Sequence, residues 1–183
     1  MATGGEQAAR AMRRAERLYS GDQVMAAVAR MAGEITAALG ESDPLVLCVM
    51  NGGLVLTGLL LPRLDFVLRV DYLHATRYRN RTHGDELQWR KRQDHDLRGE
   101  TVLVVDDILD EGHTLAAILD YCRVQGAARV CSAVLVDKCR PRTVELRPDF
   151  IGLEVPDRYV FGFGMDYKGY WRNAAGIFAA TDD

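Results

Sequence analysis

The chain has 183 residues and a formal net charge of −3, which fits one well-buried domain and is too short for two. Hydrophobic residues make up 48% and charged residues 27%, so bulk disorder is excluded. An isoelectric point near 5.8 argues against a dedicated nucleic-acid binder. The longest strongly apolar stretch, residues 54–61, is too short to cross a bilayer, and the N-terminal segment does not match a secretion signal. We expect a cytoplasmic protein that binds neither nucleic acid nor membrane.

The four cysteines lie far apart and form no C-x-x-C motif: Cys48, Cys122, Cys131 and Cys139. This spacing predicts buried free thiols in a reducing compartment. The four histidines show no ligand spacing with these cysteines, so a zinc site is not expected.

The N-terminal half shows helix and strand patterns in alternation. Residues 6–18 read as a helix, and Ser20 with Gln23 has the capping-box pattern of a second helix, whose apolar stripe runs to a stop at Gly40. Short apolar runs predict strands over 45–50 and 66–74, with a turn at 51–53 and a helix over 54–61 between them.

Residues 77–100 carry many charges and few apolar anchors. They fit either a solvated hairpin or a mobile lid that brings positive charge to an anionic ligand. On charge alone, the solvated hairpin is favoured.

The strand and helix alternation is clearest after residue 100. The pattern predicts a strand over 102–105, a helix from about 115 to Gly126, a strand over 129–136 and shorter strands over 148–153 and 159–163. We therefore predict an α/β fold in a single domain over 1–183, with a mostly parallel twisted sheet flanked by helices.

The most informative segment is residues 102–115, where a buried strand ends in an acidic pair. Asp106 and Asp107 stand at the carboxyl end of this strand, where open α/β sheets bind ligands, and adjacent carboxylates need cations or hydroxyl donors opposite them. Gly112 and Thr114 then open a helix whose first amides suit a phosphate. No Walker loop is present, and a receiver domain would place such a pair nearer its start.

This segment resembles the phosphoribosyl diphosphate (PRPP) signature of the type I phosphoribosyltransferases, and the order of the other motifs, from 45 to 172, resembles the hypoxanthine-guanine enzymes. The resemblance implies that family's fold, with a small hood from the N-terminal helices and the C-terminal segment and with residues 77–100 as a flexible lid. It implies that Asp110 is the catalytic acid or base. It also implies PRPP binding by Asp106, Asp107, Asp110, Glu111, Gly112, His113 and Thr114. Glu111 departs from the family's small hydroxyl residue.

The same resemblance assigns the pyrophosphate and metal sites. Pyrophosphate binding is implied for Asn51, Gly52, Arg77, Tyr78 and Arg172, and metal binding for Asp106, Asp107 and Asp166. Asn51 and Arg77 depart from the family's usual residues, and the peptide before Asn51 is cis in some family members.

The purine site implied by the resemblance comprises Lys138, Tyr159, Val160 and Asp166. Lys138 matches the lysine at purine C6, and an ammonium donates hydrogen bonds without accepting any, so it suits a 6-oxo group. Tyr159 would stack on the base, Val160 would meet its edge through the backbone, and Asp166 would lie near the exocyclic edge and a second Mg²⁺.

The expected function is purine salvage: Mg²⁺-dependent transfer of 5-phosphoribosyl from PRPP to hypoxanthine or guanine, giving IMP or GMP and pyrophosphate. Mn²⁺ is expected to substitute for Mg²⁺, and a homodimer or homotetramer is implied by the family alone. Two alternatives remain open. One is a non-enzymatic regulator that binds PRPP or nucleotide on the same fold, and the other is a phosphoribosyltransferase for xanthine or another base.

Overall fold

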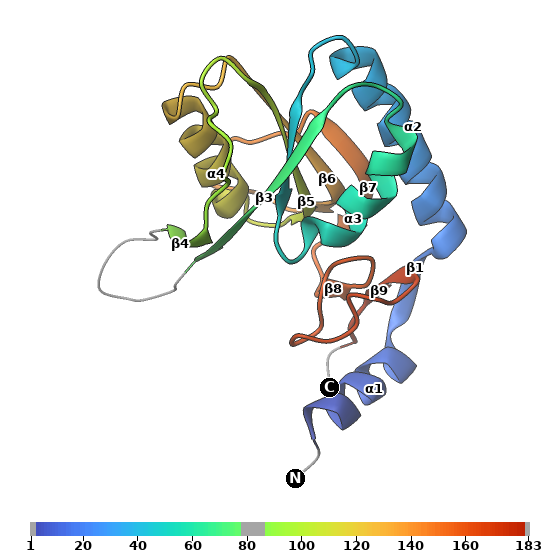
Figure 1. Cartoon of the computed structure of the whole chain (residues 1–183). Coiled ribbons are helices and arrows are strands. Elements are labelled where there is room, and N and C mark those ends of the chain that lie inside the picture. Colours follow the sequence, from blue (N-terminus) through green and yellow to red (C-terminus); the bar gives the residue numbers. More distant parts are fainter. Residues whose placement is uncertain (1–2, 78–86, 182–183) are drawn as a thin grey trace.

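The structure, a computed structural model, describes residues 3–77 and 87–181. The elements, in chain order (Figure 1), are α1 (Gly4–Arg14), β1 (Glu16–Ser20), α2 (Gly21–Leu39), β2 (Leu45–Val49), α3 (Gly53–Leu60) with a 3₁₀ turn at Leu61–Arg63, β3 (Arg69–Arg77), β4 (Leu87–Lys91), β5 (Thr101–Leu109), α4 (His113–Val124), β6 (Arg129–Cys139), β7 (Phe150–Pro156), β8 (Val160–Phe161) and β9 (Gly176–Ala179).

The main sheet has six strands in the order β4-β3-β2-β5-β6-β7. Strands β3, β2, β5, β6 and β7 run parallel, and only β4 pairs antiparallel, with β3. Helices α2 and α3 cover one face of the sheet and α4 covers the other (Figure 1). The prediction of an α/β fold with a mostly parallel, helix-flanked sheet is therefore confirmed.

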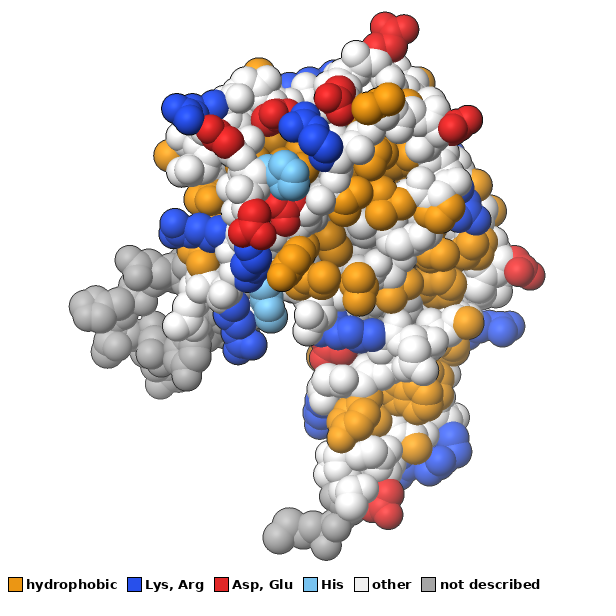
Figure 2. All heavy atoms as spheres, viewed as in Figure 1, with side chains coloured by type: hydrophobic (Ala, Val, Ile, Leu, Met, Phe, Trp, Pro, Cys, Tyr) orange, Lys and Arg blue, Asp and Glu red, His pale blue; other side chains and the backbone are white. Residues whose placement is uncertain are grey.

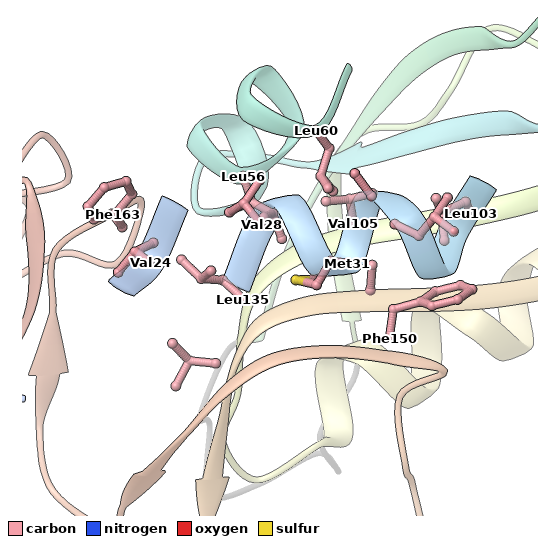
Figure 3. Packing of buried hydrophobic residues seen from close by; sticks show 14 of the residues in the cluster. Val24, Val28, Met31, Leu56, Leu60, Leu103, Val105, Leu135, Phe150 and Phe163 are labelled. Atoms are coloured by element: carbon pink, nitrogen blue, oxygen red, sulfur yellow. The ribbon is translucent and has the colours of Figure 1, made fainter. Parts of the chain in front are cut away.

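The larger part of the core lies between the sheet and helices α2 and α3. Val24, Val28 and Met31 of α2 are in one cluster with Leu103 and Leu135 of the sheet, and Figure 3 shows Val24 beside Phe163 and Val28 beside Leu56. The predicted capping box is present, since Ser20 Oγ accepts from the Gln23 amide and Gln23 Oε1 accepts from the Ser20 amide. The sequence pattern and the packing thus agree for this helix.

A second, smaller sheet of β1, β9 and β8 forms a hood beside the main sheet (Figure 1). The predicted helix over 6–18 is wrong in its last residues, because α1 ends at Arg14 and residues 16–20 form β1 instead. Glu16 pairs with Ala179 and Ser20 with Gly176, so a tertiary partner overrides the local helical pattern. Helix α1 is attached by the Trp171 indole, which donates to the Ala8 carbonyl at 2.7 Å. Helix α2 packs on the main sheet and is also in one hydrophobic cluster with Ile177 and Ala179 of β9.

Two side chains of residues 87–100 anchor this charged segment to the rest of the domain. Trp89 of β4 packs on Tyr121 of α4 with ring centroids 4.4 Å apart, and Leu97 is 1% exposed. Strand β3 begins three residues later than predicted, at Arg69. The other residues of 88–100 are mostly exposed, and β4 pairs antiparallel with β3, as the solvated-hairpin interpretation has it. The flexible-lid interpretation of residues 77–100 stays a prediction, and residues 78–86 lie outside the described residues.

Three of the four cysteines, Cys48, Cys122 and Cys131, are buried free thiols as predicted, whereas Cys139 is exposed. Cys139 lies at the last position of β6, where the strand leaves the core. In the described ranges, no helix is long and apolar enough to cross a membrane.

Candidate active site

The candidate site lies where the chain reverses direction across the sheet. After β2 the chain adds β3 and β4 on one side, and then returns to add β5 on the other side of β2. The loops that follow β2 and β5 lead to α3 and α4 on opposite faces, and such a switch point opens a crevice at the carboxyl ends of the strands. A cleft of about 420 Å³ lies there, lined by residues 49–52 and 106–115 with Ala75, Asp166 and Arg172.

The acidic pair forms the floor of this cleft. Asp106 and Asp107 are the sixth and seventh residues of β5, so the strand runs past the predicted end at 105. Burial and the neighbouring Asp107 raise the pKa of Asp106 well above its usual value, and burial likewise raises the pKa of Asp107. Arg172 Nη1 lies 3.7 Å from Asp107 Oδ2 and lowers the cost of the Asp107 charge. Two carboxylates with this environment suit a divalent cation or sugar hydroxyls.

The loop after β5 has the geometry predicted for a phosphate site. Gly112 has φ +87°, a conformation that disfavours side chains, and it caps the start of α4 at His113. Glu111, Gly112, His113 and Thr114 all line the cleft. The first amides of a twelve-residue helix thus face the same space as the acidic pair.

The loop after β2 approaches the acidic pair closely. The peptide between Met50 and Asn51 is cis, as some family members have it. A Cβ added to Gly52 would lie 2.1 Å from Asp107 Oδ2, so any larger residue would displace the Asp107 carboxylate. Asn51 and Gly52 therefore line the cleft with backbone groups next to the floor, where the pyrophosphate loop is expected.

Arg172 and Asp166 form one wall of the cleft. Arg172 Nη2 lies 2.6 Å from Asp166 Oδ1, and its Nη1 donates to the Gly164 carbonyl at 2.5 Å. Asp166 Oδ2 accepts from the Gly169 amide at 2.7 Å. In the part of the chain that the structure describes, no three His, Cys, Asp or Glu side chains gather as a metal site. The expected metal binding by Asp106 and Asp107, and by Asp166 at a second Mg²⁺, does not depend on such a group and stays a prediction.

The predicted base-binding residues surround a second, smaller cavity of about 150 Å³. Its lining includes Lys138, Tyr159, Val160 and Asp166, together with Asp107 and Asp110. Tyr159 is 52% exposed, and its hydroxyl donates to the Asp166 carbonyl at 3.2 Å. Because Asp107 and Asp110 line both cavities, the two cavities adjoin at the end of β5.

Asp110 is held by two cations. Lys138 Nζ lies 2.8 Å from Asp110 Oδ2, and Arg140 Nη1 lies 2.9 Å from Asp110 Oδ1. Partial burial alone would raise the pKa of Asp110, but the bonds from Lys138 and Arg140 lower it below its usual value. Asp110 is thus ionised at neutral pH and accepts from both cations.

Two arginines of this site were missed in the sequence. Arg140 contacts Asp110 as described above. Arg142 donates through Nε to the Asp110 carbonyl at 2.7 Å and through Nη2 to the Leu109 carbonyl at 3.1 Å, and it also pairs with Asp137. The available signal was the alternation of cations at 138, 140 and 142 after a buried strand.

The structure brings together the predicted residues of the PRPP and purine sites, with two exceptions. Arg77 ends β3, but its side chain lies outside the described part of the structure, and Tyr78 lies outside the described residues altogether. Their pyrophosphate role stays a prediction.

Comparisons with known proteins agree with this geometry. The family model of the phosphoribosyl transferase domain matches residues 14–168. The hypoxanthine-guanine phosphoribosyltransferase of Bacillus subtilis (strain 168) is 31% identical over 157 residues, which are 85% of this chain and 87% of the relative. A solved hypoxanthine-guanine phosphoribosyltransferase from Bacillus anthracis has a TM-score of 0.85 and 26% identity over 91% of this chain and 98% of the other. A solved hypoxanthine-guanine-xanthine phosphoribosyltransferase has a TM-score of 0.83 and 27% identity over 91% and 97%.

These matches span the strands that carry the acidic pair, the phosphate loop and the base-site lysine. The same residues meet in one pair of adjoining cavities. The chain therefore belongs to the phosphoribosyltransferase family and, within it, to the hypoxanthine-guanine phosphoribosyltransferases.

Proposed function

We propose that this enzyme transfers the 5-phosphoribosyl group of PRPP to hypoxanthine or guanine, giving IMP or GMP and pyrophosphate. The observation that carries the proposal is Lys138, which is 8% exposed, lines the base cavity and pairs with Asp110. A buried ammonium at that position favours a base with an acceptor oxygen at C6. The adjoining larger cleft, with its phosphate loop, provides room for PRPP.

The proposed mechanism assigns one task to each part of the site. The α4 amides and Thr114 bind the 5′-phosphate, and the loop at Asn51 with Arg172 binds the pyrophosphate. Asp110, ionised by its two cations, accepts or shares the purine N7 proton while N9 attacks the anomeric carbon. Tyr159 stacks on the base, and Val160 holds its edge.

The acidic pair fits a divalent cation, because burial makes two adjacent charges costly without one. Mg²⁺ usually binds one or two carboxylates together with substrate phosphates, and Asp106 and Asp107 would hold it in this way. When bound, Mg²⁺ would neutralise the leaving pyrophosphate, and Mn²⁺ is expected to replace it.

We also propose that the enzyme works as a homodimer or homotetramer. Val70 and Tyr72 of β3 are 46% and 41% exposed, on the strand face opposite the buried Leu73 and Ala75. Val67 and Leu54 are exposed at 76% and 54%, and Figure 2 shows hydrophobic side chains gathered on one face of the molecule. Light scattering after size-exclusion chromatography measures this state, and a monomer would contradict it. The four free cysteines support a reducing compartment such as the cytoplasm.

A panel of bases tests the proposed function. Hypoxanthine, guanine, xanthine and adenine are each assayed spectrophotometrically with PRPP, with Mg²⁺ and with excess chelator. We expect turnover with hypoxanthine or guanine that disappears in chelator and returns with Mg²⁺ or Mn²⁺. If xanthine is used in preference to hypoxanthine and guanine, xanthine replaces them as the proposed substrate. PRPP or nucleotide binding without turnover of any base would favour the regulator.

A further inference from the structure

A row of four charged side chains, with two cations between two carboxylates, crosses the carboxyl ends of three neighbouring strands. Asp110 follows β5, Lys138 and Arg140 stand at the end of β6, and Asp157 directly follows β7. The strand register explains the row, because Leu109 lies opposite Asp137, and Lys138 and Cys139 lie opposite Val155 and Pro156. The two cations therefore lie between two carboxylates that come from different strands.

Each of the two cations lies near both carboxylates, Asp110 and Asp157. Arg140 Nη1 is 2.9 Å from Asp110 Oδ1 and 3.5 Å from Asp157 Oδ1. Lys138 Nζ is 2.8 Å from Asp110 and 4.0 Å from Asp157. The side chains of Asp110 and Asp157 are 44% and 48% exposed, whereas Arg140 is 30% exposed and Lys138 is 8% exposed. The partly exposed Arg140 thus has more room to change partner than the buried Lys138.

The resting arrangement is unfavourable for a proton acceptor. Both carboxylate oxygens of Asp110 are paired with a cation, and a nearby positive charge reduces the affinity of a carboxylate for protons. If Arg140 moves from Asp110 to Asp157, one oxygen of Asp110 becomes available to the base, and Arg140 keeps an ionic partner. A side chain with two partners at 2.9 and 3.5 Å needs only a small displacement for this exchange.

We propose that Arg140 and Asp157 are positioning residues for Asp110, and that Arg140 exchanges Asp110 for Asp157 when a base enters the cavity. The inference rests on the proposed function, since it assigns the acceptor role to Asp110. Arg140 and Asp157 act through Asp110 and not on the base itself, because the described lining of neither cavity includes them.

The test is a double-mutant cycle with Asp157→Asn and Arg140→Gln. In the wild-type background, Asp157→Asn removes the alternative partner, so Arg140 stays paired with Asp110. We therefore expect kcat/KM for hypoxanthine or guanine to fall about tenfold, which corresponds to a change of about one unit in the pKa of Asp110. In the Arg140→Gln background, the same change should alter kcat/KM less than twofold. In the Arg140→Lys background the cation remains, and the tenfold loss should return. KM for PRPP should stay within twofold throughout.

A second readout needs no turnover. The pKa of Asp110 is followed by carbon-detected NMR in the free protein. Lys138 and Arg140 lie near its carboxylate, and Glu111 lies near Arg140. Arg142 donates to the Asp110 carbonyl. Arg140→Gln should raise the pKa of Asp110, whereas Asp157→Asn should lower it. A pKa of Asp110 unmoved by either change would overturn the proposal, even if no base were turned over.

The exposed pair Asp120 and Arg123 on α4, 2.7 Å apart, provides the matched control. Asp120→Asn and Arg123→Gln should leave kcat/KM unchanged, alone and together. Additive losses for Asp157→Asn and Arg140→Gln would show a merely structural role and would refute the exchange. A wild-type enzyme inactive with every base would instead contradict the proposed function, and the NMR titration would still test whether Arg140 and Asp157 set the pKa of Asp110.

Discussion

Asp71 offers a stability prediction whose magnitude follows from its surroundings. Its carboxylate is 7% exposed and accepts from the amides of Tyr72, Asp94 and His95 at 2.7, 2.8 and 3.1 Å, while His95 Nδ1 lies 2.8 Å away. Burial alone would raise the pKa of Asp71, but the hydrogen bonds, with His95 foremost, lower it to about 2. Asp71 thus links the start of β3 to the segment that follows β4.

The stabilisation can be worked out from the two pKa values. An aspartate has an ordinary pKa of about 3.9, and each unit corresponds to about 1.36 kcal/mol, so ionised Asp71 contributes about 2.5 kcal/mol at neutral pH. Because the folded-state pKa is the lower one, this contribution is present above pH 4 and is lost as the pH falls toward 2. By linkage, about 1.3 kcal/mol remains at pH 3.

We expect Asp71→Asn to lower the free energy of unfolding by about 2–3 kcal/mol at pH 7, since the amide cannot accept from all of these donors. For a chain of this size, that is a fall in Tm of about 5–10 °C. The assay is urea unfolding of both proteins at pH 7, 5 and 3, and the difference should narrow at pH 3. Asp96→Asn is the control, because Asp96 pairs with Arg98 on the surface and its loss should leave the free energy of unfolding almost unchanged. A loss below 0.5 kcal/mol for Asp71→Asn, or the same loss at every pH, would refute the reasoning.

Three further substitutions test the site. Asp110→Asn should lower kcat by about 10²-fold or more while PRPP binding measured by calorimetry persists; unchanged turnover would remove Asp110 from proton transfer. Lys138→Gln should reduce kcat/KM on hypoxanthine and guanine and narrow the preference over adenine, which we expect to be at least about 10²-fold in the wild type; an unaltered ratio would exclude Lys138 as the base reader. Gly52→Ala should raise KM for PRPP, because the added Cβ would meet Asp107. Gly58→Ala is the control, because Gly58 has open space around it; this variant should retain activity and gain up to about 1 kcal/mol of stability.

The parts of the fold that could be predicted are those with local signals. The Ser20 capping box, the apolar stripe of α2 and the short apolar run of β2 each depend on neighbours within one element, and each was found in place. Strands β1 and β9 were not predictable in this way. They pair across about 160 residues of sequence, as Glu16 with Ala179. The local pattern of the arginine-rich segment before Ser20 predicts a helix, because that pattern does not contain the distant partner strand.

The candidate site was predictable to the same extent. The acidic pair and the glycine before α4 form one continuous motif, so their chemistry was legible in the sequence. Arg140 and Arg142 were not, because their partners Asp110 and Leu109 are about 30 residues away and become neighbours only through the pairing of β5 with β6. The cations at 138, 140 and 142 alternate in the sequence, but this alternation does not identify the partner of each side chain.

The two ends of the site balance charge in different ways. At the proposed ribose and diphosphate end, Arg172 Nη1 lies 3.7 Å from Asp107 Oδ2 of the acidic pair, and the proposed substrate is a polyanion. At the base end, Lys138 and Arg140 already compensate Asp110, and the base brings little charge. A polyanion approaching an acidic floor needs additional positive charge between them, whereas a nearly neutral base does not. The expected metal requirement therefore belongs to the diphosphate end, and selectivity among bases belongs to residues of this chain.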